Sequence, residues 1–187
     1  MELKTFIVAG TPGAGKTTVL SKVRFEKIGK ITHVNMGNEM LKHASIGDRD
    51  RLRYLSTEKQ KELRAKAIEE LSRNKGVLVI DTHLSVKHGS TYLPGFSTKE
   101  LKKLNVKGIF YIDADAKEIM KRRKKDKSRK REMESEDEIN MQREVNLALL
   151  AVAATELNIP IYMLRNIEGK ADEVAEEMKN LLKGAVK

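Results

Sequence analysis

The stretch Val8-Ala9-Gly10-Thr11-Pro12-Gly13-Ala14-Gly15-Lys16-Thr17-Thr18 decides the fold class of this chain. It continues the apolar run Thr5 to Val8, and a helical pattern begins near its end. The spacing Gly10-x-x-x-x-Gly15-Lys16-Thr17 matches a phosphate-binding loop, which lies between a strand and a helix. A glycine-rich turn with a chance lysine is the alternative, but it leaves the agreement of every required position unexplained. The stretch therefore predicts a cradle for nucleotide phosphates.

Each group in this loop has an expected role. Glycines allow the backbone amides to point inward, and the start of the following helix adds the positive end of its dipole. Lys16 adds a mobile positive charge for the terminal phosphates, and the Thr17 hydroxyl can bind Mg²⁺. The residues expected to hold the nucleotide are Gly10, Thr11, Pro12, Gly13, Ala14, Gly15, Lys16, Thr17 and Thr18.

A second magnesium group is expected from a neighbouring strand. The apolar run Val77 to Ile80 ends in Asp81, and carboxylates in that position of phosphate-binding-loop folds usually lie beside the metal. Asp81 is therefore predicted to hold Mg²⁺ through a bound water. A carboxylate that only caps or closes the loop after the strand is the other interpretation.

Composition excludes several other classes of site. The chain has 187 residues and no cysteine, which excludes disulfides and thiolate zinc sites. Its longest apolar run, Leu147 to Ala154, is too short to span a bilayer, so we expect a cytoplasmic protein without a membrane partner. The net charge of +10 suits nucleic acid, an anionic membrane surface or small polyanions such as nucleotides, and cannot choose among them.

Strand and helix patterns alternate along the chain, which predicts one α/β domain over residues 1–187 with a parallel sheet covered on both faces. Ser135 with Glu138, Thr57 with Gln60, and Thr98 are candidate helix caps. The helix from Ser135 is apolar all round over Leu147 to Ala154, which favours a core helix or one shared with another subunit. Strands are expected at Thr5–Ala9, Ile31–Asn35, Val77–Asp81, Gly108–Ile112 and Ile159–Leu164, and helices at Gly15–Lys27, Asn38–Ala44, Thr57–Arg73, Thr98–Leu104, Asp115–Lys125, Ser135–Leu157 and Lys170–Lys183.

A small kinase needs two anion sites and a basic element that closes over the transferring phosphoryl group. Arg49 and Arg53 could clamp a monophosphate if their segment is helical, although an ordinary charged surface turn fits equally well. The run Lys121 to Arg131 is a candidate lid, or else a solvated basic helix end. The chain lacks the Asn-Lys-x-Asp stretch of guanine-specific switch proteins, since Asn74-Lys75 continues with Gly76-Val77.

These segments together resemble the archaeal type of adenylate kinase almost from end to end. The resemblance rests on the loop at residues 10–18, Val34-Asn35-Met36-Gly37-Asn38-Glu39-Met40, Asp48-Arg49-Asp50-x-x-Arg53, Asp81-Thr82-His83, Gly89-x-x-Tyr92-Leu93-Pro94-Gly95 and the short basic lid. It implies a three-layer P-loop kinase fold with a five-stranded parallel sheet, and a homotrimer. Unlike bacterial adenylate kinases, this chain has Lys42 where they have an arginine soon after the Gly37 position.

The same resemblance implies residue roles. ATP is expected on the P-loop, and AMP in a region at about residues 35–74 together with the Asp81-Thr82-His83 loop. The AMP candidates are Asn35, Gly37, Met40, Arg49, Arg53 and His83, and the catalytic candidates are Lys16 with Arg123, Arg129 and Arg131 from a lid at about residues 121–135.

The expected reaction is ATP plus AMP to two ADP with Mg²⁺, which would maintain the balance of adenine nucleotides. An acceptor phosphate is already an anionic nucleophile, so no general base is required. Two alternatives are a kinase for another nucleoside monophosphate and a nucleotide-dependent regulatory or nucleic-acid-binding protein. Four tyrosines, four phenylalanines and no tryptophan offer few rings for base stacking, so no nucleic acid partner is expected.

Overall fold

A computed structural model describes residues 2–125 and 134–186, with the side chains of residues 49 and 50 left out. Its main sheet has five strands in the order β2-β3-β1-β6-β7, and every neighbouring pair is parallel. A separate antiparallel hairpin follows β3. The strands are β1 (Leu3–Ala9), β2 (Ile31–Asn35), β3 (Gly76–Asp81), β4 (Ser85–His88), β5 (Thr91–Pro94), β6 (Val106–Asp113) and β7 (Ile161–Arg165).

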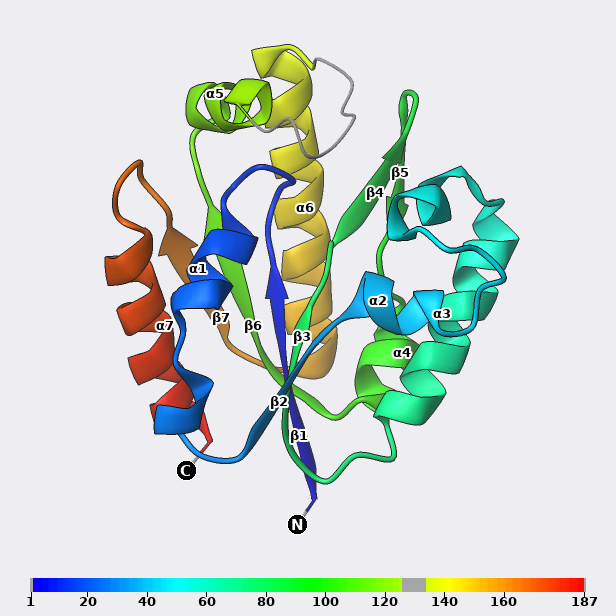
Figure 1. Cartoon of the computed structure of the whole chain (residues 1–187), viewed down its shortest axis with the longest axis vertical. Coiled ribbons are helices and arrows are strands. Elements are labelled where there is room, and N and C mark those ends of the chain that lie inside the picture. Colours follow the sequence, from blue (N-terminus) through cyan, green and yellow to red (C-terminus); the bar gives the residue numbers. More distant parts are fainter. Residues whose placement is uncertain (1, 126–133, 187) are drawn as a thin grey trace.

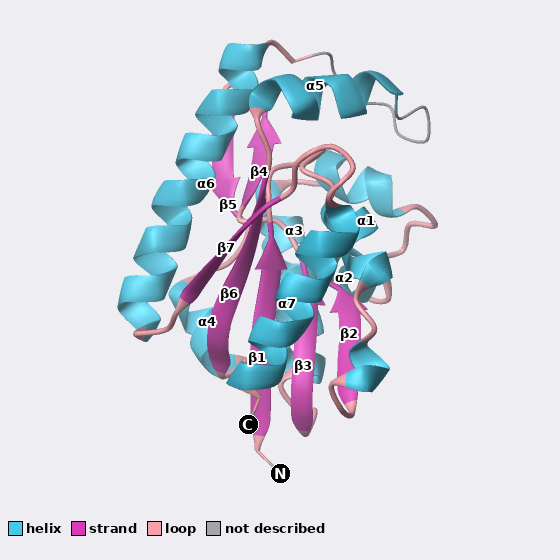
Figure 2. Ribbon diagram, turned by 90° about the vertical axis from the view of Figure 1, so that its left-hand side faces the viewer, coloured by secondary structure: helices cyan, strands magenta, loops and turns pink. Residues whose placement is uncertain are grey.

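Helices cover both faces of this sheet and make three layers (Figures 1 and 2). On one face, α1 and α7 pack on apolar side chains such as Phe6 and Phe110; on the other, α2, α3, α4 and α6 pack on Ile7, Ile80 and Tyr111. The three-layer α/β fold is as expected. The helices are α1 (Lys16–Lys22), η1 (Phe25–Lys27), α2 (Met36–Leu41), η2 (Arg49–Tyr54), α3 (Thr57–Leu71), α4 (Thr98–Lys103), α5 (Ala116–Lys125), α6 (Glu136–Leu157) and α7 (Ala171–Ala185).

Local side-chain chemistry fixes where several helices start. Ser135 and Glu138 form the expected capping box at α6. The caps of α3 and α4 lie one residue earlier than expected, at Ser56 and Ser97, because each serine accepts a hydrogen bond from the amide three residues further on. The expectations for Thr57 and Thr98 as caps are therefore wrong.

Two further expectations are corrected. The β4–β5 hairpin was not expected, because its strands are only four residues long and show no clear apolar alternation. The first helix ends at Lys22 instead of Lys27, because Val23 has an extended backbone and Phe25 begins a separate 3-10 turn.

Sheet order explains where a ligand can lie. The chain leaves central β1 for β2 and β3 on one side and reaches β6 and β7 on the other, so the order reverses at β1. In open α/β sheets, ligands bind at such a switch point, beyond the carboxyl ends of the strands. Val8 pairs with Asp81 across β1 and β3, so the P-loop and Asp81 emerge side by side at this point.

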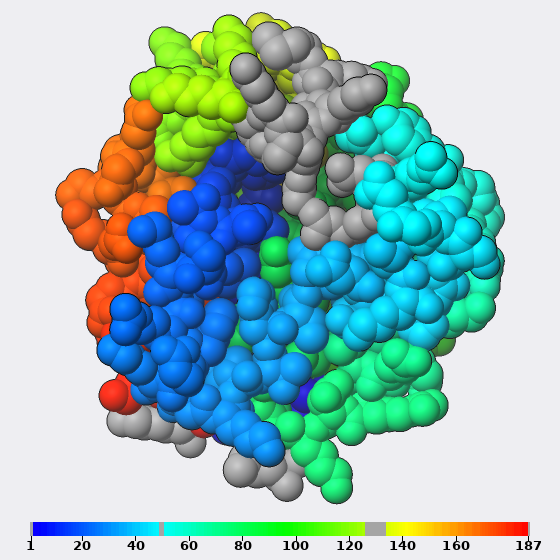
Figure 3. Space-filling model, viewed as in Figure 1, coloured from blue at the N-terminus to red at the C-terminus, as the bar shows by residue number. Residues whose placement is uncertain are grey.

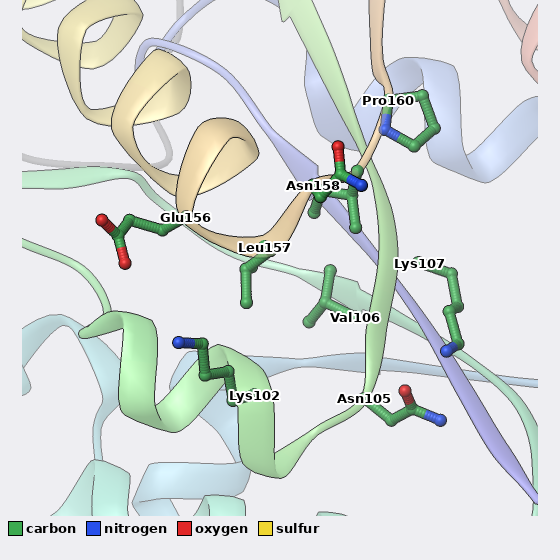
Figure 4. A pocket seen from close by; sticks show the side chains of 9 residues that line it. Lys102, Asn105, Val106, Lys107, Glu156, Leu157, Asn158 and Pro160 are labelled. Atoms are coloured by element: carbon green, nitrogen blue, oxygen red, sulfur yellow. The ribbon is translucent and has the colours of Figure 1, made fainter.

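A cavity of about 380 Å³ lies at the other end of the sheet (Figure 4). Residues at the amino ends of β6 and β7, including Val106 and Pro160, line it together with Lys102 of α4 and Glu156 of α6. It is therefore separate from the P-loop. No helix in the described ranges has the length and apolar character needed to cross a membrane.

Candidate active site

Glycines give the P-loop its shape. Gly13 and Gly15 have φ angles of 95° and 89°, which side chains rarely adopt. At Gly10 an added Cβ would lie 2.3 Å from the carbonyl oxygen of Ile112, and at Gly15 it would lie 2.2 Å from the amide nitrogen of Asn166. Neighbouring strands and loops thus approach this turn so closely that only glycine fits.

Side chains from other elements hold the loop's carbonyl groups. Arg123 Nε donates to Pro12 O at 2.8 Å. Ala14 O accepts from Arg122 at 2.9 Å and from Asn166 Nδ2 at 2.7 Å. The start of α1 has no side-chain cap at Gly15, so its first amides are left for a ligand. This is the arrangement that binds an anion at a helix N-terminus.

Lys16 and Asp81 form an ion pair at the floor of the site. The two side chains are each 9% exposed. Asn35 Nδ2 donates to the other Asp81 oxygen at 2.8 Å. Burial raises the pKa of Asp81, but the charge and hydrogen bond of Lys16 and the bond from Asn35 outweigh it and hold the pKa below its usual value. The carboxylate is therefore ionised and poised beside the P-loop.

The residues present fit a hydrated magnesium ion. Thr17 is exposed at the first turn of α1, and Asp81 ends the adjacent strand. Within residues 2–125 and 134–186, no group of three or more His, Asp or Glu side chains could hold a metal. Mg²⁺ in kinases uses one or two protein groups together with phosphates and waters, so a sparse site is what this ion requires.

Arg123 is held by a half-buried carboxylate, Glu134, that sequence reasoning missed. Glu134 pairs with Arg123 and accepts a hydrogen bond from Lys87 of β4 at 2.8 Å. The side chains of Arg123 and Glu134 are 8% and 12% exposed. Burial raises the pKa of Glu134, but its bonds from Lys87 and Arg123 outweigh this and lower it. Arg123, Glu134 and Lys87 thus join α5 to the hairpin beside the P-loop.

Only part of the expected lid lies within the described residues. Lys121 to Lys125 belong to α5, so this part of the basic run is a helix end packed on the P-loop. Arg129 and Arg131 lie outside the described residues. Arg122, which lies within the same basic run, contacts the loop as closely as Arg123 does. In the sequence, only the density of basic residues in this run pointed to Arg122 as a contact of the P-loop.

Candidates for the acceptor site lie across from the P-loop. Asn35 caps α2 by accepting from the Asn38 amide, and it also bonds Asp81. Gly37 lies in the first turn of α2, while Met40 is 8% exposed and belongs to the apolar core. His83 is close enough to Asp81 for its charge to act on that carboxyl. Asn35 and His83 therefore lie at the same strand end as Asp81.

Arg53 lies further along, in η2. Its guanidinium lies 4.8 Å from the Tyr54 ring centre and donates to the Tyr54 hydroxyl at 2.9 Å. The segment is a 3-10 helix, with about three residues per turn, and not the α-helix on which the expected clamp of Arg49 and Arg53 depended. The side chain of Arg49 lies outside the described residues.

The surface view separates the P-loop side of the molecule from the side that carries α2 and η2. In Figure 3 the blue surface near the N-terminus and the cyan surface around residues 45–60 lie on opposite sides of the view. Green surface from the middle of the chain is visible between them. The P-loop side and the side that carries α2 and η2 therefore face each other across the carboxyl ends of the strands (Figure 1).

Comparison with known proteins identifies the family of this chain. A family model described as an AAA domain matches residues 9–140. The adenylate kinase of Sulfurisphaera tokodaii is 36% identical, with 95% of this chain and 98% of that protein covered. That of Methanothermobacter thermautotrophicus is 34% identical, with 96% and 100% covered.

Solved structures give the fold alone. Shikimate kinase from Acinetobacter baumannii has a TM-score of 0.66 at 17% identity, and the match covers 100% of this chain and 97% of that one. Shikimate kinase from Aquifex aeolicus has a TM-score of 0.60 at 17% identity, with 96% of each chain covered. With the P-loop geometry and the full-length matches to archaeal relatives, the chain belongs to the adenylate kinase family.

Proposed function

We propose that this adenylate kinase transfers a phosphoryl group reversibly between ATP and AMP, with Mg²⁺, to give two ADP. The observation that carries the proposal is the buried pair of Lys16 and Asp81, which joins the P-loop helix to the end of the neighbouring strand. Kinases need a mobile cation and a metal-holding carboxylate at such a point. The relatives that match nearly the whole chain carry the same activity in their names.

The P-loop amides and Lys16 would bind the donor phosphates. Lys16 would exchange the Asp81 carboxylate for phosphate oxygens, which leaves Asp81, together with Thr17, to hold hydrated Mg²⁺. The ion supplies charge neutralisation at the phosphates when bound. The remaining residues of the loop, from Gly10 to Thr18, orient the phosphates through their backbone.

Arginines would stabilise the charge that spreads over the transferring group. Arg123 already lies against the P-loop, held there by Glu134. We propose that Arg129 and Arg131 act with it. A well-placed arginine of this kind contributes about 10³ to 10⁵ in rate.

AMP would bind on the opposite side, in the region of about residues 35–74 with His83. Asn35, Gly37, Met40, Arg49 and Arg53 remain the proposed contacts there. The phosphate of AMP needs no general base, so the site has to orient it in line with the donor phosphoryl group. The P-loop follows β1 and the Asp81–His83 loop follows β3, which is adjacent to β1, so the two loops are close enough for such an alignment.

A coupled assay of ADP formation from ATP with AMP, GMP, CMP or UMP tests the proposal. We expect AMP to give a kcat/KM at least about tenfold above the other three, since hydrogen bonds to the correct base edge discriminate by at least this much. Transfer mainly to another nucleotide would make the protein a kinase for that acceptor. ATP hydrolysis without transfer to any of them would favour the regulatory alternative.

We further propose a homotrimer in the cytoplasm, where these nucleotides are exchanged. Support for assembly comes from apolar side chains on α6 and β7. Leu147, Val152 and Met163 are 39%, 56% and 53% exposed. Leu147 and Val152 belong to α6, whose other side packs in the core. Large exposed apolar side chains favour a subunit contact.

A further inference from the structure

A chain of buried hydrogen bonds crosses the molecule behind the P-loop. Ser85 Oγ donates to Asn146 Oδ1 at 2.7 Å, and Asn146 Nδ2 donates to Thr11 Oγ1 at 3.2 Å. Thr11 Oγ1 also lies 3.3 Å from the Tyr111 hydroxyl. None of these four residues is more than 2% exposed. The network is therefore shielded from water over its whole length.

Asn146 is the central member of this network. Its carbonyl oxygen can only accept and its amide nitrogen can only donate, so one side chain serves two different partners. The next inward positions on α6, Leu150 and Ala153, are apolar and belong to the core. A buried amide is unfavourable unless both of its ends are bonded, and once bonded it holds its partners in a fixed geometry.

The two partners belong to the two loops of the proposed reaction. Thr11 is part of the P-loop, which holds the donor nucleotide. Ser85 begins β4, directly after the segment that carries Asp81 and His83. β1 and β3 are paired as far as Val8 and Asp81, with the Thr82 amide donating to Val8 O at 3.0 Å. Beyond that point the Lys16–Asp81 ion pair joins the two loops directly, and Asn146 of α6 adds a bridge behind it. In Figure 1, α6 runs behind β1 and beside β4.

We propose that Asn146 is a positioning residue that fixes the separation of the donor and acceptor loops. The inference rests on the proposed function, because only a two-site transfer enzyme needs this separation fixed. Asn146 touches neither substrate and acts through Thr11 and Ser85. A misplacement of about 1 Å between reacting groups can lower a rate about 10²-fold, so one bridging amide can govern turnover.

Binding of a bisubstrate compound separates this role from a merely structural one. Two adenosines joined through five phosphates must meet both sites at one fixed distance, whereas ATP and AMP each meet one site. Dissociation constants for all three ligands are measured with wild type and Asn146→Ala. We expect the variant to weaken the bisubstrate compound about tenfold more than either single nucleotide, and to lower kcat with little change in KM.

Leu150→Ala is the matched control, one turn further along the same face of α6. It removes buried atoms and lowers the melting temperature without breaking the bridge. We expect it to leave the ratio of bisubstrate to single-nucleotide affinity unchanged. An equal change in that ratio for Asn146→Ala and Leu150→Ala would overturn the proposal.

Ser85→Ala breaks the same bridge by removal of one oxygen and serves if Asn146→Ala does not fold. We expect Ser85→Ala to reduce the bisubstrate affinity selectively. Where Asn146→Ala folds, the double variant Ser85→Ala/Asn146→Ala should lose little more affinity than Asn146→Ala alone, since the effects of contacting residues are not additive. A Ser85→Ala protein with an unchanged affinity ratio would contradict the bridge. Wild-type protein that binds the bisubstrate compound no better than ATP would instead contradict the two-site function itself.

Discussion

Lys16 has two partners in succession under the proposed reaction, the Asp81 carboxylate and then the nucleotide phosphates. It emerges from the P-loop at the first position of α1, nearly buried, with its charge directed at the end of β3. An uncharged side chain of similar length could fill much of the same space, but it could not neutralise the charge of the phosphates. The charge is therefore the feature to remove.

Lys16→Met should lower phosphoryl transfer by several orders of magnitude, because one charge in a closed phosphate site stabilises the transition state by several kcal/mol, about 3 or more. Steady-state ADP formation measures the loss, and circular dichroism checks the fold. Lys22→Met on the same helix is the control, because Lys22 forms an exposed pair with Asp172 away from the loop. Near-normal turnover of folded Lys16→Met would refute the role.

Asp81 should make stability depend on pH in acid. Its pKa is lowered in the folded protein from the ordinary 3.8, so its charged form stabilises the fold above that value and this contribution is lost as the pH falls through the folded pKa. Asp81→Asn removes the effect. We expect denaturant melts at pH 6 to show a less stable variant, and the difference to shrink as the pH of the melts is lowered from 3.8 through the folded pKa. A difference that is constant with pH would contradict the assignment.

At the scale of elements, α6 has three separate tasks. Its capping box starts the helix directly after Glu134, its buried face carries Asn146, and Leu147 and Val152 are exposed on the rest of its surface. The apolar run is thus core on one side and open on the other. The capping box at its N-terminus can be removed by a single substitution, so its contribution to stability can be measured directly.

Ser135→Ala should destabilise the protein by about 1 kcal/mol, because it leaves an amide of the first turn without its acceptor. The melting temperature should fall by about 2–4 °C for a chain of this length. Ser21→Ala is a suitable control, since its hydroxyl bonds only a carbonyl of its own helix. Equal melting temperatures for wild type and Ser135→Ala would show that the box contributes nothing.

At the scale of the whole molecule, helices cover the two faces of the sheet, and α6 and β7 each carry an exposed apolar side chain. These are Val152 and Met163, which are both more than half exposed. Contact between copies would remove this surface from water. The proposed trimer depends on such contact.

Val152→Glu should convert a trimer to monomers, because a charge would then be buried without a partner at the contact. Light scattering coupled to size exclusion measures the mass. Glu144→Gln, on an exposed turn of the same helix, should leave the assembly intact because it adds no charge. A wild-type protein that is monomeric at all concentrations would contradict the trimer.

The sequence alone determined the sheet, the P-loop and the family. Gly10 to Thr18 and the strand ending at Asp81 carry local signals, since glycine spacing and apolar runs encode backbone conformation directly. The resemblance of several short motifs then led to the adenylate kinase family, which full-length relatives support. The Ser135 capping box was also readable, because its partners are three residues apart.

Only the tertiary structure decided which distant side chains hold these segments. Asn146 lies 135 residues from Thr11 and Glu134 lies 47 residues from Lys87, and no periodicity links such pairs. The turn type of η2 and the β4–β5 hairpin likewise depend on what packs around short, polar segments. Burial makes these contacts strong, and burial is a property of the folded chain. The residues that position the two loops therefore become recognisable only once α6 lies against the sheet.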